Sequence, residues 1–231
     1  MVLNSYVLRL ITYVLIDYNM IKLKLISTTG GDNMTDYEKI TKIALEHSNL
    51  FKTKMVVEAG IRKEKIREML ECGYIERVGH GLYSLCNEDV DEYYEFQQRC
   101  PKGIFSYGTS AYFWNLSDRV PNVLNCTVPR GYNTSRLKID TKVKYHYVPK
   151  ELYDVGVIEI TSPQGAKIRV YNRERTICDL VKDRKKMDMQ LYSNALNGYF
   201  KGKEKNIRKL MKYGRLFHIT EELEKYMEVL Q

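Results

Sequence analysis

The chain has 231 residues, of which 44% are hydrophobic, and it carries a formal net charge of +8 with a pI near 9.1. It contains no long polar tract and is long enough for two modest domains, and its basic balance predicts an anionic partner. The five cysteines are odd in number and lack the two-residue spacing of zinc ligands. We therefore expect a cytoplasmic protein with no disulfide framework, metal or other cofactor.

The first thirty-three residues form an unusual leader. Residues 6–26 are rich in β-branched and aromatic residues, but charges such as Arg9 and Asp17 limit the uncharged runs to lengths too short to cross a bilayer. The codons for Gly30-Gly31-Asp32 can spell a bacterial ribosome-binding sequence just before Met34. We therefore expect residues 1–33 to be a mis-annotated or disordered extension, with Met34 as the natural start, and we expect no membrane partner.

Residues 34–86 predict a winged helix-turn-helix. Apolar residues at helical spacing predict a first helix over residues 36–47, and Met55, Val56 and Ala59 predict a second one that ends at Gly60. A third helix is expected from Arg62 to Cys72, because Ile66, Met69 and Leu70 form one buried stripe. Residues 75–85 then read as two strands around a glycine-rich turn. Such a unit inserts its last helix into a major groove and lays its hairpin wing along the backbone.

The expected DNA contacts lie on the third helix and the wing. The helix carries nearly balanced charge, and winged helices also serve as protein-binding modules, so a protein- or RNA-interaction module is the alternative. We expect Lys63, Lys65 and Arg67 to contact phosphates, whereas Glu64 either accepts from a cytosine amino group or is an ordinary solvated charge. The candidate DNA-binding residues are Arg62, Lys63, Glu64, Lys65, Arg67, Arg77 and His80.

Residues 87–100 are expected to form a linking helix, and Pro101-Lys102-Gly103 marks a domain boundary. Residues 101–231 predict a second, mixed α+β domain, which makes the whole chain α+β. Thr109 is expected to cap a short helix, strands are expected over residues 123–128, 143–148, 155–161 and 167–171, and the last two are expected to pair as a hairpin. Asn172 is the expected cap of a further helix, and three helices are expected over residues 188–197, 203–213 and 220–230, delimited by Gly198, Gly214 and Thr220.

The basic charge is concentrated in the second domain. Residues 100–231 hold twenty-four basic and fourteen acidic residues, whereas residues 34–85 hold nine and eight. The segment from Lys201 to Arg215 predicts a basic helix, either solvated or bound to phosphates, and a basic loop lies between two predicted strands. The candidate basic surface comprises Arg130, Arg136, Lys205, Arg208, Lys209, Lys212 and Arg215.

Signals of catalysis are weak. The chain has no phosphate-cradling glycine loop, no nucleophile elbow and no zinc-protease motif. Asp154 and Glu159 faintly suggest a metal-dependent nuclease, but Thr161 occupies the position where that chemistry needs a lysine. We therefore expect no enzymatic activity.

The order of motifs resembles that of the AbiEi antitoxins of type IV toxin-antitoxin systems, which are linked to abortive phage infection. The motifs are A-G-I at residues 59–61, I-E-R-V-G-H-G-L-Y at 75–83, G-I-F-S-Y-G-T-S-A-Y-F-W-N-L at 103–116, T-V-P-R-G at 127–131 and E-R-T-I-C-D-L at 174–180. They are individually modest and collectively fairly specific, and they span the chain from about Tyr37 to its end.

The resemblance implies a bacterial autorepressor that binds inverted repeats in its own promoter, with a second domain that opposes a nucleotidyltransferase toxin, without binding it stably. It also implies a role for the motif around Arg175 and Asp179. These two residues are four apart on a predicted helix, so an intrahelical ion pair is the expected role and antitoxin activity the alternative.

Overall fold

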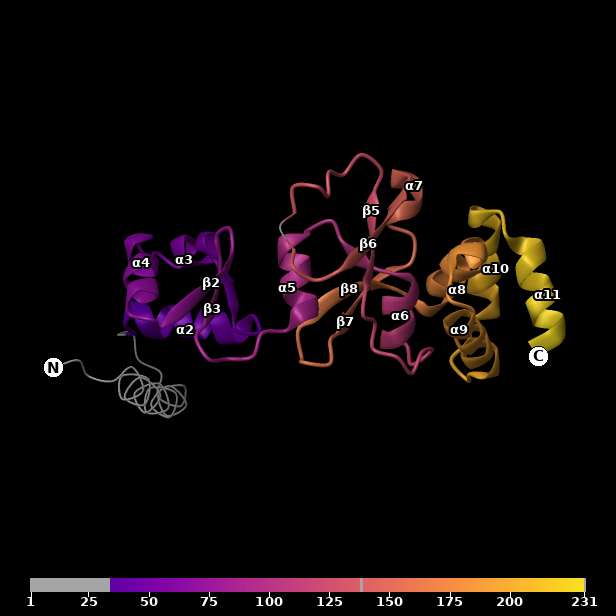
Figure 1. Cartoon of the computed structure of the whole chain (residues 1–231), viewed down its shortest axis with the longest axis horizontal. Helices are drawn as coiled ribbons and strands as arrows, with labels where there is room; N and C mark the ends of the chain where they lie inside the picture. Colours follow the sequence, from indigo (N-terminus) through magenta and orange to yellow (C-terminus); the bar gives the residue numbers. More distant parts are fainter. Residues whose placement is uncertain (1–33, 138, 231) are drawn as a thin grey trace. The chain divides into compact units, whose positions relative to one another are not determined.

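The computed structural model describes residues 34–137 and 139–230, and the chain divides into two units between Glu88 and Asp89 (Figure 1). Both units contain helices and strands, so the expected α+β class is confirmed. The expectations for residues 1–33 fall outside the described residues. None of the helices in the described ranges is long and apolar enough to cross a membrane.

The first unit has the element order of a winged helix-turn-helix. Among its described residues it has three helices and a small antiparallel sheet of order β1-β3-β2, in which β2 and β3 form a hairpin, and we interpret it as a winged helix-turn-helix on that basis. Its elements are α2 (Asp36–Glu46), β1 (Leu50–Lys52), α3 (Thr53–Glu58), α4 (Glu64–Glu71), β2 (Ile75–Gly79) and β3 (Leu82–Leu85).

Local signals explain the boundaries of this unit. Thr35 and Glu38 form a reciprocal capping box that starts α2. Gly60 has a φ of +78°, which glycine tolerates at little cost, and this allows the chain to turn between α3 and α4. The buried side chains of Ile40, Val56 and Met69 lie in one core, as the helical stripes predict. This core fixes the face that α4 turns toward solvent.

The second unit is built on a five-stranded mixed sheet of order β6-β5-β4-β8-β7. The expected hairpin of β7 and β8 is confirmed as an antiparallel pair, and β5 runs parallel to β6. The elements up to the sheet's last strand are α5 (Glu92–Arg99), β4 (Ile104–Phe105), α6 (Tyr107–Phe113), β5 (Leu124–Pro129), β6 (Val143–Val148), α7 (Lys150–Tyr153), β7 (Val157–Thr161) and β8 (Lys167–Tyr171).

Helix α5, expected to link two domains, packs in the core of the second unit. Tyr93 and Phe96 are buried against Phe105. The Gln97 amide also donates to the Arg169 carbonyl and accepts from the Arg169 N–H, both at 2.8 Å. The helix is therefore fixed to strand β8 by side-chain packing and by paired hydrogen bonds.

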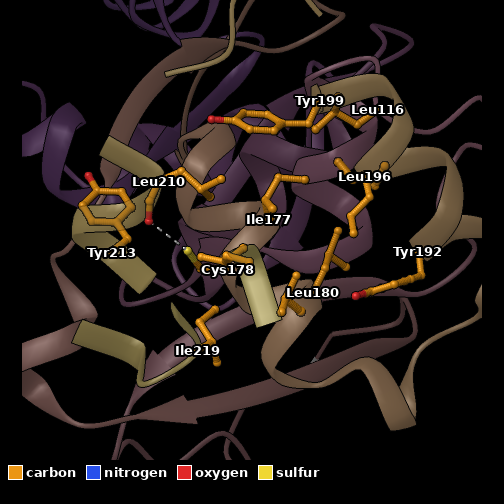
Figure 2. Packing of buried hydrophobic residues seen from close by; sticks show 14 of the residues in the cluster. Leu116, Ile177, Cys178, Leu180, Tyr192, Leu196, Tyr199, Leu210, Tyr213 and Ile219 are labelled. Atoms are coloured by element: carbon orange, nitrogen blue, oxygen red, sulfur yellow. Dashed lines mark hydrogen bonds between the residues drawn. The ribbon is translucent and has the colours of Figure 1, made fainter. Parts of the chain in front are cut away.

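Four helices and one 3-10 turn follow the sheet in the described part of the chain, and the buried side chains of the four helices form a hydrophobic cluster (Figure 2). Ile177, Leu180, Leu196 and Leu210 are buried in it, and Asn172 caps its first helix as expected. The elements are α8 (Arg173–Lys182), η1 (Arg184–Lys186), α9 (Met189–Lys201), α10 (Ile207–Phe217) and α11 (Thr220–Leu230).

Several expected boundaries in the second unit are wrong. Gly198 and Gly214 lie inside helices rather than at their ends; a Cβ at Gly214 would come within 2.7 Å of Leu223 Cδ1, so this glycine permits close packing of α10 on α11. The segment from Lys201 to Arg215 is not one helix, because a turn separates α9 from α10. Thr109 does not cap α6, which begins after Ser106; its hydroxyl instead accepts from the Asn125 N–H at 2.8 Å.

Candidate nucleic-acid interface

The turn between α3 and α4 presents two basic side chains. Arg62 and Lys63 are exposed and, in the described parts of the chain, neither has a carboxylate partner. Both lie just before α4, which begins at Glu64 rather than at Arg62 as expected. Their charges are therefore free to meet phosphates without breaking an existing ion pair.

The two cations on α4 itself are paired with glutamates of the same helix. Lys65 lies 2.5 Å from Glu68, and this hydrogen bond raises the pKa of Lys65. Arg67 donates to Glu71 at 2.8 Å. Pairs of this kind on a helix surface contribute little to stability, so phosphate can displace them. The mixed charge that the sequence shows thus reflects intrahelical pairing, and Glu64 remains exposed.

The wing carries two exposed donors near its tip. Strands β2 and β3 form the expected hairpin, with Gly81 at a φ of +63° in the turn and an irregular register between Arg77 and Gly79. Arg77 donates from Nε to the Gly79 carbonyl at 3.3 Å, and His80 is exposed in the turn. This bond uses one of the five N–H donors of the guanidinium, so the others stay available.

The candidate basic surface of the second unit comes from two parts of the fold. Arg130 and Arg136 are exposed after β5, whereas five residues lie on α10 or just before it. Two of these five have partners within the protein: Lys209 lies 3.5 Å from buried Glu174, and Lys205 donates to the Phe200 carbonyl. Within this set, the exposed cations without a carboxylate partner among the described residues are Arg130, Arg136, Lys205, Arg208, Lys212 and Arg215.

The motif residues Arg175 and Asp179 form the expected ion pair on α8, and the pair is buried. Arg175 Nε donates to Asp179 Oδ1 at 2.9 Å, with side-chain exposures of 0% and 4%. The guanidinium also donates from Nη1 to the carbonyls of Leu152 and Val155. Burial outweighs the attraction of Arg175 and raises the pKa of Asp179 to about 6. Arg175 thus connects α8 to α7 and to the segment that follows it.

The sequence interpretation missed a pocket of about 390 Å³ in the second unit. It lies between strand β6 and the end of α8, and its lining includes Tyr107, His146 and Asp179. Tyr107 stacks on His146 with ring centroids 3.7 Å apart, and its hydroxyl donates to Asp183 at 2.6 Å. No local motif could have indicated this pocket, because its residues are scattered over more than half of the second unit.

The structure offers no support for a nuclease centre. Asp154 and Glu159 are both exposed, the first after α7 and the second on β7. Across residues 34–137 and 139–230, no group of three His, Cys, Asp or Glu side chains is arranged to hold a metal ion.

One comparison with known proteins matches most of the first unit. Residues 38–85 match the model of a family described as "Transcriptional regulator, AbiEi antitoxin", which confirms the resemblance over this segment. No curated protein matches the chain.

A solved structure shares the fold over most of the chain. The crystal structure of the RV2827C protein from Mycobacterium tuberculosis matches with a TM-score of 0.55, covering 81% of this chain and 74% of that one. The two sequences are 12% identical, so the likeness concerns the fold alone.

Proposed function

We propose that this protein is a bacterial type IV antitoxin and transcriptional autorepressor that acts in the cytoplasm and has no catalytic role. Its first unit binds inverted repeats in the promoter of its own operon, and its second unit counteracts a nucleotidyltransferase toxin without forming a stable complex, as part of a phage defence. The observation that carries the proposal is the coincidence of the antitoxin-family match at residues 38–85 with the compact unit built from α2 to β3.

The exposed basic residues around α4 and in the wing support the following proposed contacts with DNA. Arg62 and Lys63 neutralise phosphates at the start of α4. Lys65 and Arg67 also bind phosphates, after their ion pairs with glutamate have been broken. Glu64, in the first turn of the helix, accepts from a cytosine amino group in the major groove. The wing donors Arg77 and His80 bind the backbone beside the groove.

Salt dependence tests this proposal. Each phosphate neutralised by a cation steepens the dependence of log K on log salt by about 0.9. Arg62→Ala with Lys63→Ala should therefore weaken binding to the operon's upstream DNA and lower the slope by about 2. The matched control is Lys39→Ala with Lys42→Ala, which removes the same charge from exposed positions on α2. An unchanged slope in the Arg62→Ala, Lys63→Ala variant would show that the start of α4 does not contact the DNA.

The alternative is a protein- or RNA-interaction module. It is favoured by the charge distribution, because the first unit is almost neutral while residues 100–231 carry the basic excess. Filter binding of promoter DNA, random DNA and structured RNA separates the two functions. Tight binding of RNA with equal, weak affinity for both DNAs would favour the alternative.

The antitoxin role is tested separately from DNA binding. Co-expression of this protein should restore the growth of cells that produce a nucleotidyltransferase toxin encoded in the same operon. The Arg62→Ala, Lys63→Ala variant should restore growth as well, because its second unit is unchanged. Failure of the wild-type chain to restore growth would contradict the antitoxin role, and recovery of a stable complex with the toxin would contradict the proposed mechanism.

A further inference from the structure

The pocket beside strand β6 contains a buried acceptor that the protein leaves unused. Asp179 lines the pocket and is 3% exposed. Its Oδ1 accepts from Arg175 Nε, but in the described part of the chain its Oδ2 has no hydrogen-bond partner, nor does Arg175 Nη2. The pair is therefore held by one hydrogen bond instead of two. Buried polar atoms nearly always have a partner, so this oxygen indicates a donor that the chain itself does not supply.

Three lysines line the same pocket. Lys144 comes from β6, Lys182 from the last turn of α8 and Lys186 from η1. Lys186 lies 3.5 Å from Asp183, whereas Lys144 and Lys182 have no carboxylate partner among the described residues. A cation in the last turn of a helix is favoured by the helix dipole, which is sufficient reason for Lys182. It does not explain Lys144, which reaches the pocket from the sheet.

The two carboxylates of the pocket are already compensated. Asp179 is paired with Arg175, and Asp183 accepts from Tyr107 and faces Lys186. Burial lowers the pKa of His146 to about 4, so this ring is neutral near pH 7 and adds no charge. The ammonium groups of Lys144 and Lys182 therefore give the pocket an uncompensated positive charge, which favours an anion.

The aromatic lining and the volume of the pocket limit the size and the chemistry of the rest of the ligand. The stacked rings of Tyr107 and His146 line the pocket together with Phe217. Tyr107 holds a left-handed backbone with a φ of +47°, an unusual conformation for a non-glycine residue that is enriched at ligand sites. The pocket volume of about 390 Å³ is within the range of small-molecule sites.

We propose that this pocket binds a phosphate monoester whose other end carries an amino or hydroxyl donor, a class that includes mononucleotides and sugar phosphates. The phosphate binds Lys144 and Lys182, the donor binds Asp179 Oδ2, and the body of the ligand fills the pocket between them. The inference does not depend on DNA binding, because every residue involved lies in the second unit.

Calorimetric titration of the full chain tests the proposal. The probes are the four common nucleoside monophosphates, ribose 5-phosphate, inorganic phosphate and adenosine. At least one monoester should bind at millimolar concentration or below, more tightly than inorganic phosphate and adenosine, because only the monoesters satisfy both the lysines and Asp179. Preference for a nucleotide over ribose 5-phosphate would assign the donor to the base, and equal binding would assign it to the sugar.

Two variants with a matched control assign the contacts. Lys144→Ala with Lys182→Ala should lower the affinity for the monoester by about ten-fold or more, because a hydrogen bond to a charged group is lost at each position. Lys142→Ala with Lys185→Ala removes the same charge from exposed neighbours outside the lining and should leave the affinity within about two-fold. Asp179→Asn should reduce the preference for the monoester over inorganic phosphate, and circular dichroism shows whether this variant remains folded.

Three results would overturn the proposal: no monoester binds at millimolar concentration, inorganic phosphate binds as tightly as every monoester, or the control pair of lysines matters as much as Lys144 and Lys182. Binding of single-stranded RNA in the absence of any monoester binding would also overturn the proposal. That result would assign the two lysines to a nucleic-acid surface. The lysine variants keep the test valid if Asp179→Asn fails to fold, because both lysines are exposed.

Discussion

The guanidinium of Arg175 and the carboxylate of Asp179, one turn apart on α8, form an ion pair that is almost fully removed from solvent. The guanidinium centre lies 4.0 Å from the ring centroid of Tyr171 and 4.3 Å from that of Phe217. Removing two charges from water costs free energy that a single hydrogen bond does not fully recover, so the remaining contacts of Arg175 must contribute. The pair therefore joins the sheet, α8 and α10 around one cation.

Removing one partner of this pair should destabilise the second unit strongly. Arg175→Met leaves the carboxylate of Asp179 buried without its cation, and we expect a loss of about 3–5 kcal/mol in the free energy of unfolding. The double variant Arg175→Met with Asp179→Leu should recover a large part of this loss, because no buried charge remains. Urea unfolding followed by circular dichroism measures both. A double variant less stable than the single one would show that Asp179 is stabilised by something other than Arg175.

Replacing Lys65 and Arg67 should affect DNA binding less than replacing Arg62 and Lys63. The first two must give up glutamate partners before they meet phosphate, whereas the second two have none among the described residues. We expect a difference of about two-fold to ten-fold in Kd between the two double alanine variants at one salt concentration. Fluorescence anisotropy with promoter DNA measures this ratio, and equal losses would contradict the pairing argument.

Stability should respond to pH through His146. Its folded-state pKa is about 4, below the usual value of 6.5, so the unfolded chain binds the proton more readily. Its contribution is therefore fully present above about pH 6.5 and is lost as the pH falls toward 4. Between pH 7.5 and pH 5.0 the expected loss from this group is about 2 kcal/mol.

The control for this prediction is His146→Phe, which keeps an aromatic ring beside Tyr107 and cannot titrate. Asp179 acts in the opposite direction, since its raised pKa of about 6 makes the fold more stable as the pH falls from 6 toward 3.8. The informative quantity is thus the difference in pH dependence between wild type and variant in urea unfolding. Identical pH profiles for wild type and variant would contradict the lowered pKa of His146.

Two glycines with positive φ should differ in their tolerance of a methyl group. A Cβ at Gly60 would meet nothing within 4 Å, so Gly60→Ala should cost only the backbone strain of about 1–2 kcal/mol. A Cβ at Gly156 would lie 2.8 Å from Arg175 Cβ, and overlap adds to the strain. We expect Gly156→Ala to lower the melting temperature of the second unit by more than Gly60→Ala lowers that of the first. The reverse order would contradict the packing around Arg175.

Local patterns in the sequence were sufficient for the three helices and the hairpin of the first unit, but they did not indicate strand β1. The stripe of Ile66 and Met69, the turn at Gly60 and the hairpin glycine at Gly81 each act within a few residues, and the structure places all of them as expected. The Asn172 cap and the spacing of Arg175 and Asp179 were predictable for the same reason. The free charges at Arg62 and Lys63 could only be separated from the paired ones once side-chain contacts were known.

Interactions between distant segments decided the rest. Strand β4 is only two residues long, so it has no detectable periodicity, yet its pairing with β5 and β8 places it at the centre of the sheet. The packing of β6, α8 and α10 determines how deeply Arg175 is buried. The same packing brings Lys144, Lys182 and Asp179 together around one pocket. Sequence spacing determines which residues share one helix or strand, whereas burial and charge neighbours are set by contacts that close long loops, and these arise only in the folded chain.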